Sequence, residues 1–339
     1  MRVVVLGTGL IGTSIALGLR GAGWTTSGWD PDPDVLAAAH GRGAFDDVRT
    51  SGVVPTAADA DVVVLAGPPQ AVIDTAAGMD TDALVMDVAG VKVPVAEAAS
   101  GRRFVGTHPM AGRETSGPEA ASPALFRGAA WVVVTDGAAD PDVATVESLV
   151  AALGARSLRM SAAEHDVAVA AISHLPQVLA GALLIEAAAE TQALDLAAGS
   201  FRDLTRVAAS DPGVWAQLLE INRGPLRAAI DGVMGRLVGL AEALDAGDDD
   251  AVTAFLSDAR RLRRSLAPTV APVRVALADR PGELARVGHA LEATAVDVRD
   301  LQLRHAPHGG GGVLTLVVRP GEAEPLRHAL EAEGLVVVE

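Results

Sequence analysis

The sequence predicts an α/β chain of three parts: a Rossmann-type dinucleotide-binding domain, an all-α domain, and a small domain of ferredoxin-like element order. Three observations lead to this fold class. The block from Gly7 to Gly12 has Gly-x-Gly-x-x-Gly spacing and stands between an apolar run and a helical stretch. Apolar runs and helical stretches alternate up to about residue 160. Beyond it the chain is rich in Ala and Leu, and strand patterns return only near residue 272.

Residues 1–160 contain short, nearly continuous apolar runs that are typical of buried strands. A strand of a parallel sheet is covered by helices on both faces, so it lacks the alternation of a half-exposed strand. Helical stretches between the runs complete the βαβ pattern of a doubly wound nucleotide-binding domain. The expected strands are 2–6, 25–29, 61–66, 83–88, 104–107 and 130–135.

Residues 161–267 are expected to form helices only. Ser161 and Glu164 have the spacing of a capping box that opens a long helix. Pro176 falls inside this helix and is expected to kink it, because proline lacks the N–H that the helix ladder needs. An all-helical segment after a dinucleotide domain often supplies a wall of the substrate site and a dimer interface, which is an analogy between folds.

Residues 272–339 follow a short linker that contains proline, and they show the ferredoxin-like order βαββαβ. A run of glycines suits the hairpin loop between two of the strands, since glycine tolerates positive φ. The expected strands are 273–277, 296–305, 312–318 and 335–338.

Composition narrows the class of function. The formal net charge is −16 and no long basic block occurs, so no nucleic-acid partner is expected. The chain has no Cys, which excludes disulfides and thiolate chemistry. The eight His residues show no metal-ligand spacing, so no metal is expected.

The N-terminal apolar run at residues 3–19 contains four glycines and is therefore interpreted as strand, turn and helix, not as a secretory signal. No other stretch has the length of an uninterrupted apolar span. A soluble, cytoplasmic protein without a membrane partner is therefore expected.

The glycine-rich block predicts a site for the pyrophosphate of a dinucleotide. Gly7 permits the tight turn, Gly9 lets the pyrophosphate approach the backbone, and Gly12 lets the helix pack on the strand. Leu10 and Ile11 belong to the same first helical turn, whose free N–H groups and dipole favour phosphates. These five residues are the first cofactor-binding candidates.

Asp30 lies 18 residues beyond Gly12, at the end of the second expected strand. A carboxylate there can accept hydrogen bonds from ribose hydroxyls and would repel a 2′-phosphate, so NAD is favoured over NADP. The alternative is an ordinary turn residue.

Gly67 and Pro68 follow the third expected strand, at the edge where ligands bind, and are expected to line the nicotinamide side. A simple strand terminator is the alternative there.

Three further motifs follow. His108 stands in Thr-His-Pro-Met-Ala-Gly-Arg-Glu-Thr-Ser-Gly at residues 107–117, directly after an expected strand. His174 stands in Ser-His-Leu-Pro within the long helix, and Arg206 ends the segment Phe-Arg-Asp-Leu-Thr-Arg. Together with the glycine-rich block, these motifs resemble the prephenate/arogenate dehydrogenase family over about residues 1–267. The tail, at 272–339, resembles a regulatory ACT domain through its segment Asp-Arg-Pro-Gly-Glu-Leu and its element order.

The resemblance implies an NAD-dependent oxidative decarboxylation of prephenate to 4-hydroxyphenylpyruvate in tyrosine biosynthesis. A hydride leaves C4 of the cyclohexadiene ring, the 4-hydroxyl loses its proton, and CO₂ departs as the ring becomes aromatic. Such a site needs a base near the hydroxyl, a cation near the ring carboxylate, and a dry, well-placed nicotinamide. The resemblance also implies a homodimer, and tyrosine as an effector bound by the ACT domain.

Five residues are the candidates for chemistry and substrate binding in the matching motifs. His108 is the candidate base, because a neutral imidazole can take the hydroxyl proton near pH 7. Arg206 is the candidate clamp for the carboxylate, because a guanidinium fork binds both oxygens. His174, Glu114 and Thr115 are expected in the substrate pocket. The alternatives are a core histidine for His174 and surface loop positions for the other two.

Two positions depart from the family pattern. Gly90 stands where the family often has a serine whose hydroxyl shares the substrate's 4-hydroxyl. Gln177 stands where a second histidine often follows the helix proline, and it is the candidate for contact with the substrate side chain. A neutral amide can serve a keto acid or an amino acid, so arogenate stays an alternative substrate. Lys92, the only lysine, is either part of the site or a solvated helix-start residue.

Two other functions stay open. A dehydrogenase of the β-hydroxyacid or imine-reducing kind would share the NAD domain and the helical segment, but it does not predict the His108 and Arg206 motifs together. A catalytically silent NAD-binding sensor would report through the ACT domain. Such a sensor would bind NAD and produce no NADH from either cyclohexadiene acid.

Overall fold

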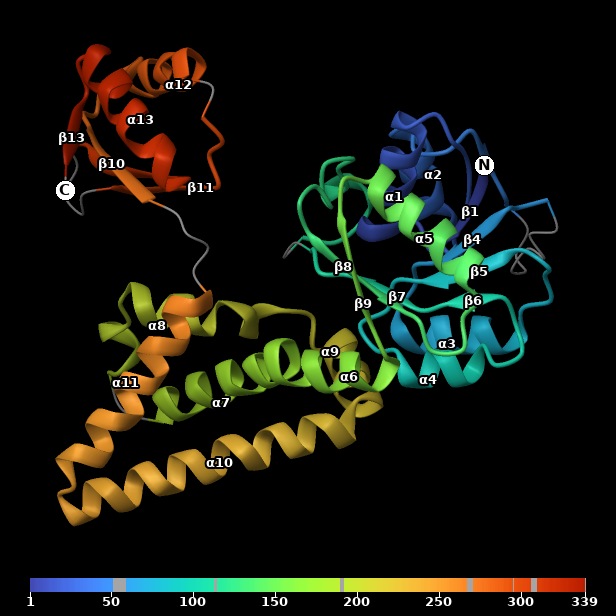
Figure 1. Cartoon of the computed structure of the whole chain (residues 1–339), viewed down its shortest axis with the longest axis horizontal. Coiled ribbons are helices and arrows are strands. Elements are labelled where there is room, and N and C mark those ends of the chain that lie inside the picture. Colours follow the sequence, from blue (N-terminus) through green and yellow to red (C-terminus); the bar gives the residue numbers. More distant parts are fainter. Residues whose placement is uncertain are drawn as a thin grey trace. The chain divides into compact units, whose positions relative to one another are not determined.

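A computed structural model describes residues 1–50, 59–112, 115–189, 192–266, 271–294, 296–305 and 310–338 (Figure 1). The chain divides into two compact units, Met1–Arg236 and Leu237–Glu339, and each is described by itself. The first unit contains a parallel sheet and most of the helical segment, and the second contains a small antiparallel sheet.

The first unit is built on a six-stranded parallel sheet of order β3-β2-β1-β4-β5-β6. The strand order reverses beside β1, which confirms the doubly wound architecture. Its strands are β1 (Arg2–Leu6), β2 (Thr25–Trp29), β3 (Asp47–Val48), β4 (Val62–Leu65), β5 (Leu84–Asp87) and β6 (Phe104–Val105). Its helices are α1 (Leu10–Gly21), α2 (Pro33–Gly41), α3 (Pro69–Gly78), α4 (Val93–Ala98) and α5 (Asp140–Ala152).

Side chains on β1 alternate between two cores, because successive residues of a strand face opposite sides of the sheet. Val3 and Val5 belong to one buried apolar cluster, together with residues of α1 and α5. Val4 and Leu6 belong to the other, together with residues of α3 and α4. Helices thus cover both faces of the sheet (Figure 1), which explains the continuous apolar pattern of its strands.

The expectation of one strand at 104–107 is wrong, because the chain leaves the parallel sheet at Gly106. Beyond it, a separate three-stranded sheet contains β7 (Thr107–Pro109), β8 (Ala130–Val134) and β9 (Arg156–Met160). The strand expected at 130–135 is β8 and lies in this second sheet. The chain leaves the parallel sheet because the Thr107 N–H donates to the Asp87 side chain at 3.0 Å instead of extending the ladder with β5.

The helical segment opens with the capping box that the sequence predicts. Ser161 Oγ accepts from the Glu164 N–H at 3.1 Å, and Glu164 Oε2 accepts from the Ser161 N–H at 2.8 Å. The distortion expected at Pro176 takes the form of a π-helix, η2 (Ala170–His174), since Pro176 offers no N–H to the preceding turn. The other elements are α6 (Ala162–Val169), α7 (Leu175–Ala189), α8 (Gly199–Thr205), α9 (Pro212–Ile221), α10 (Arg223–Ala246) and the 3-10 helices η1 (Pro118–Ala120), η3 (Leu194–Leu196) and η4 (Arg206–Ala209).

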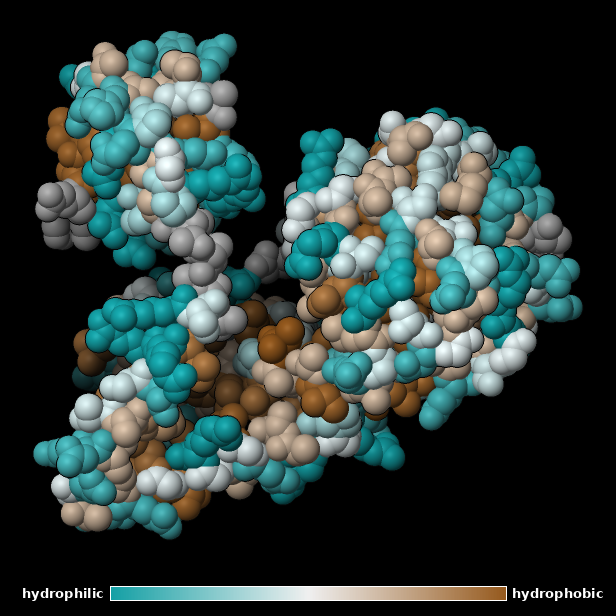
Figure 2. Space-filling view, in the orientation of Figure 1, coloured by the Kyte–Doolittle hydropathy of each residue, from teal (hydrophilic) through white to brown (hydrophobic). Residues whose placement is uncertain are grey.

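The helical run Ala162–Ala189 overturns the expectation that no second apolar span occurs. By length and composition alone it could cross a membrane, with a mean hydropathy of 1.8 over a window of which 28% is buried. Its first turns nevertheless contain buried polar residues, such as Asp166, that bond to the sheet domain. Figure 2 shows hydrophobic side chains at the surface of the helical segment. The exposed ones in the first unit are Val167, Ile172, Leu179, Leu183, Ile185, Leu194, Leu196, Leu204, Val214 and Met234.

The second unit confirms the expected βαββαβ order. Its four strands form an antiparallel sheet of order β11-β12-β10-β13, with a buried apolar core between sheet and helices. Part of the expected linker, residues 267–270, lies outside the described residues. The elements are α11 (Asp249–Leu266), β10 (Ala271–Leu277), α12 (Glu283–Thr294), β11 (Asp300–His305), β12 (Gly312–Val318), α13 (Pro320–Ala332) and β13 (Val336–Val338).

The packing of α1 on β1 yields a prediction for two glycines. A Cβ at Gly12 would overlap the Gly7 carbonyl oxygen, whereas a Cβ at Gly9 meets no atom within 4 Å. Gly12→Ala should therefore lower the free energy of unfolding by about 1–3 kcal/mol or more, and Gly9→Ala should change it by less than about 0.5 kcal/mol. Urea unfolding of both variants checks this, and equal stabilities would contradict the packing described.

Candidate functional site

The loop between β1 and α1 has the geometry that a phosphate-binding turn needs. Gly7 has a φ of +99°, and a Cβ there would lie 2.6 Å from the Ala66 carbonyl carbon. Only glycine adopts this conformation without strain. Gly12 packs against the loop itself, while Gly9 faces open space at the start of α1. A ligand phosphate can therefore approach the backbone at Gly9 and the helix N-terminus.

A cavity of about 500 Å³ opens at this loop. Its walls come from the carboxyl ends of neighbouring strands, which is where doubly wound sheets bind ligands. Five residues expected to bind the cofactor line it, whereas Leu10, Ile11 and Gly12 do not. The lining includes Gly7, Gly9, Asp30, Gly67 and Pro68, together with Ser116 and Gly117 from the segment that follows His108.

Asp30 is held at the wall of this cavity by its neighbours. Its Oδ2 accepts from the Thr8 N–H at 2.7 Å and from the Thr8 hydroxyl at 3.2 Å, and its Oδ1 accepts from the Asp32 N–H at 3.0 Å. A carboxylate fixed there suits ribose hydroxyls and disfavours a 2′-phosphate. The cavity, the open backbone at Gly9 and this carboxylate together fit a dinucleotide of the NAD type.

A buried ion pair fixes the strand that carries the candidate base. Lys92 Nζ contacts Asp87 Oδ2 and donates to the Thr107 carbonyl at 2.6 Å, and both charged side chains are fully buried. Asp87 Oδ1 accepts from the Thr107 N–H. Thr107 is thus held through both of its backbone groups. The alternative of a solvated Lys92 is wrong, since this residue is 1% exposed.

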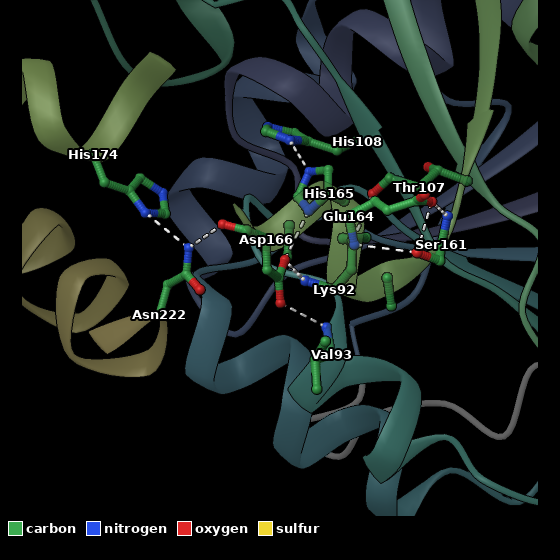
Figure 3. Close-up of polar contacts among 12 residues, drawn as sticks. Lys92, Val93, Thr107, His108, Ser161, Glu164, His165, Asp166, His174 and Asn222 are labelled. Carbon is green, nitrogen blue, oxygen red and sulfur yellow. Dashed lines mark hydrogen bonds and ion pairs between the residues drawn. The ribbon is translucent and has the colours of Figure 1, made fainter. Parts of the chain in front are cut away.

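His108 follows Thr107 on β7 and is half-buried, and Figure 3 shows it beside His165. Its Nδ1 lies 2.9 Å from His165 Nε2, and His165 Nδ1 lies 2.8 Å from Asp166 Oδ1. Burial holds the pKa of His108 well below its ordinary value, and the Lys92 charge and the neighbouring histidines act in the same direction. The imidazole is therefore neutral near pH 7 and can accept a proton.

His174 ends the π-helical turn and is linked to Asp166 through Asn222. Asn222 Nδ2 donates to the Asp166 carbonyl at 2.8 Å and lies 3.1 Å from His174 Nδ1. The Trp215 ring meets the His174 ring edge-on, with centroids 6.2 Å apart. Burial lowers the pKa of His174, although the Asp166 charge opposes the shift.

Three residues of this network were not predicted from the sequence: His165, Asp166 and Asn222. The only sequence signal for His165 and Asp166 is their polarity, because they interrupt an otherwise apolar helical run. Nothing in the sequence marks Asn222, which lies in the turn between α9 and α10.

The remaining candidates lie outside the network drawn in Figure 3. Arg206 opens η4, which packs against α7, and its side chain is exposed. Gln177 lies on α7, and its Oε1 is buried without a hydrogen-bond partner among the described residues. Thr115 is exposed, and Glu114 lies outside the described residues.

Gly90 lies directly beside the candidate base. A Cβ built on it would be 3.8 Å from His108 Cε1 and 3.3 Å from Leu218 Cδ1. The position where a serine was expected from the resemblance is thus adjacent to the imidazole. Leu218 of α9 is the neighbour that a larger side chain would displace.

Two domains of one known family match this chain. The nucleotide-binding domain of prephenate dehydrogenases matches residues 15–159, and their dimerisation domain matches residues 161–258. The chain is 26% identical to prephenate dehydrogenase of Bacillus subtilis, over 92% of this chain and 90% of that protein. It is 31% identical to cyclohexadienyl dehydrogenase of Zymomonas mobilis, over 78% of this chain and 96% of that protein.

Among solved structures, prephenate dehydrogenase from Aquifex aeolicus in complex with hydroxyphenyl propionate and NAD⁺ has a TM-score of 0.71. It is 27% identical, and the alignment covers 79% of this chain and 98% of that chain. The two domain matches extend over well more than half of the sequence. The chain therefore belongs to the prephenate dehydrogenase family and uses NAD as its cofactor.

Proposed function

We propose that this protein catalyses the NAD-dependent oxidative decarboxylation of prephenate to 4-hydroxyphenylpyruvate, a step toward tyrosine. The observation that supports it is the neutral, half-buried imidazole of His108. This residue stands on β7, from which the chain leads to Ser116 and Gly117 in the wall of the dinucleotide cavity. We propose that this connection brings the base and the bound cofactor to one edge of the fold.

In this proposal His108 takes the proton of the 4-hydroxyl, so that the C4–O bond becomes a carbonyl as hydride leaves C4. Bound NAD supplies the acceptor for that hydride. The bond between C1 and the ring carboxylate then breaks and CO₂ departs. The electron pair of the broken C1–carboxylate bond makes the ring aromatic and turns the C4 oxygen into a phenolate. His108 then returns the proton to this oxygen. Proton transfer by a positioned imidazole typically contributes 10²–10⁴-fold to the rate.

Substrate binding is assigned to the other candidates of the sequence analysis. Arg206 would bind the ring carboxylate, and its helix η4 packs on α7, the helix that follows His174. His174 and Gln177 would contact the substrate from the π-helical turn and the first turn of α7. Thr115 would approach it from the segment after β7, and Glu114 is proposed as a further contact of the substrate.

Arogenate is the second candidate substrate, and one observation favours it. The buried Oε1 of Gln177 is an acceptor without a partner among the described residues. Such an atom gains from a donor, and the ammonium group of arogenate is a donor where prephenate has a keto oxygen. The product would then be tyrosine itself.

We infer a cytoplasmic homodimer with a nucleotide-binding domain at 1–160, a helical domain at 161–267 and a regulatory domain at 272–339. The exposed apolar side chains of α7 and α8 suit a second copy of the chain. The matching family domain is also named for dimerisation. A monomer mass in light scattering would contradict the dimer.

The C-terminal βαββαβ domain is proposed to be an ACT domain that binds tyrosine. Its β10–α12 loop lines a cavity of about 300 Å³, which is large enough for an amino acid. Asp279, Arg280 and Glu283 in this lining offer charges of both signs. Tyrosine should raise the melting temperature, and the absence of any change in melting temperature or rate would contradict a regulatory role.

Turnover tests the function directly. The formation of reduced cofactor is measured with prephenate and with arogenate, as NADH when NAD is supplied and as NADPH when NADP is supplied. NAD should be preferred, and His108→Ala should lose roughly 10²–10⁴-fold in kcat while its NAD affinity stays that of the wild type. Binding of NAD without turnover of either acid would identify a sensor instead. Unchanged kcat in His108→Ala would remove His108 from the mechanism.

The pH profile of kcat/KM tests the protonation state of the base. Protonated His108 cannot accept the hydroxyl proton, so activity falls as pH decreases through its pKa. Because burial and the Lys92 charge lower this pKa, the acid limb should lie below the ordinary histidine value of about 6.5. An inflection at or above that value would contradict the environment described for His108.

The role of Arg206 in binding the ring carboxylate is tested by measuring KM and kcat separately. Arg206→Ala should raise KM for the cyclohexadiene acid by about 10–100-fold, the range for loss of a charged hydrogen bond, with a smaller effect on kcat. Arg206→Lys keeps the charge but not the fork and should recover only part of the affinity. A wild-type KM in the alanine variant would assign the clamp to another residue.

A further inference from the structure

Asp166 lies where two hydrogen-bond chains meet (Figure 3). Its carboxylate reaches His108 through His165, and its backbone carbonyl reaches His174 through Asn222. The residues of this network other than His108 are between 1% and 3% exposed. Water therefore has little access to these bonds, and the protein groups alone determine which atom donates in each.

The first chain fixes the protons on two imidazoles. A carboxylate only accepts, so His165 Nδ1, at 2.8 Å from Asp166 Oδ1, carries a proton. Neutral His165 has one N–H, and its Nε2 is therefore an acceptor. His108 Nδ1, at 2.9 Å from that nitrogen, must donate. The Nε2 of neutral His108 is then left with a free lone pair.

The second chain gives His174 the opposite arrangement. The Asp166 carbonyl only accepts, so the Asn222 atom beside it is the amide nitrogen. The second N–H of this amide points to His174 Nδ1 at 3.1 Å, which makes Nδ1 the acceptor. The proton of neutral His174 therefore sits on Nε2.

Asp166 is itself held rigidly. Its Oδ1 accepts from the Lys92 N–H at 2.7 Å, and its Oδ2 accepts from the Val93 N–H at 2.9 Å. Both oxygens are thus oriented by the start of α4 before any ligand binds. The His165 ring, fixed on one of these oxygens, cannot exchange its two nitrogens by rotation without losing that bond.

We propose that Asp166 sets complementary proton positions on the two histidines, so that His108 offers Nε2 as an acceptor and His174 offers Nε2–H as a donor. Among the described residues, no hydrogen bond uses either of these nitrogens, and both stay available to a substrate. Resting on the proposed function, the acceptor takes the 4-hydroxyl proton and the donor binds a substrate oxygen. Asp166, His165 and Asn222 are positioning residues for this pair.

Nitrogen-15 NMR of the histidine rings tests the proposal in the full-length protein without NAD or substrate. Spectra of His108→Gln and His174→Gln assign the two signals. His108 should carry its proton on Nδ1 and His174 on Nε2. A proton on Nε2 of His108, which a positively charged His165 would produce, overturns the proposal, and so does a proton on Nδ1 of His174.

Two variants of His165 separate proton positioning from mere packing. His165→Gln keeps an acceptor oxygen for His108 Nδ1, whereas His165→Leu removes it. The leucine variant should lose roughly 10²–10⁴-fold in kcat, as expected when a catalytic histidine is freed to adopt the wrong tautomer, and its His108 signal should shift toward the Nε2–H form. The glutamine variant should retain the Nδ1–H form and most of the activity.

Equal losses in both variants with an unchanged His108 tautomer would reduce His165 to a packing residue. If the leucine variant does not fold, the wild-type spectrum still decides the proton positions. If the wild type turns over neither cyclohexadiene acid, the proposed function fails while the measured tautomers stand on their own.

Discussion

The buried contact between Asp87 and Lys92 is the interaction on which the site depends. Removing two charges from water is costly, and their attraction offsets the cost only when further hydrogen bonds satisfy both groups. Asp87 also accepts from the N–H groups of Ala89 and Thr107, and Lys92 also donates to the Thr107 carbonyl. The same bonds turn the chain out of the parallel sheet and present His108 on a separate strand.

Hydrogen bonds at the start of α4, beside this ion pair, connect the nucleotide-binding domain to the helical segment. The first N–H groups of a helix lack partners within the helix, and at α4 they belong to Lys92 and Val93. Asp166, a residue of α6, accepts from both. A helix N-terminus of the nucleotide-binding domain is thus capped by a side chain of the helical domain. This contact brings His165, the residue directly before Asp166, within reach of His108.

Local features of the sequence were sufficient for most of the fold. The strands at 2–6 and 25–29 were predicted to the residue, because turn residues mark both ends of each run. The capping box at Ser161 and the βαββαβ order of the tail followed from short patterns as well. The departure at Gly106 was not predictable, because it depends on a side-chain bond from Thr107 to Asp87 across 20 residues.

The sequence by itself determined most of the elements, though not strands β3 and β9, together with the glycine turn of the NAD site and His108 and His174 as candidate residues. Only the tertiary structure decided how the two histidines are connected, through His165, Asp166 and Asn222. His108 and His165 are 57 residues apart, and Lys92 and Asp166 are 74 apart. Periodicity and turn chemistry act over a few residues, whereas partners at such separations become visible only when the chain has folded and excluded water from between them.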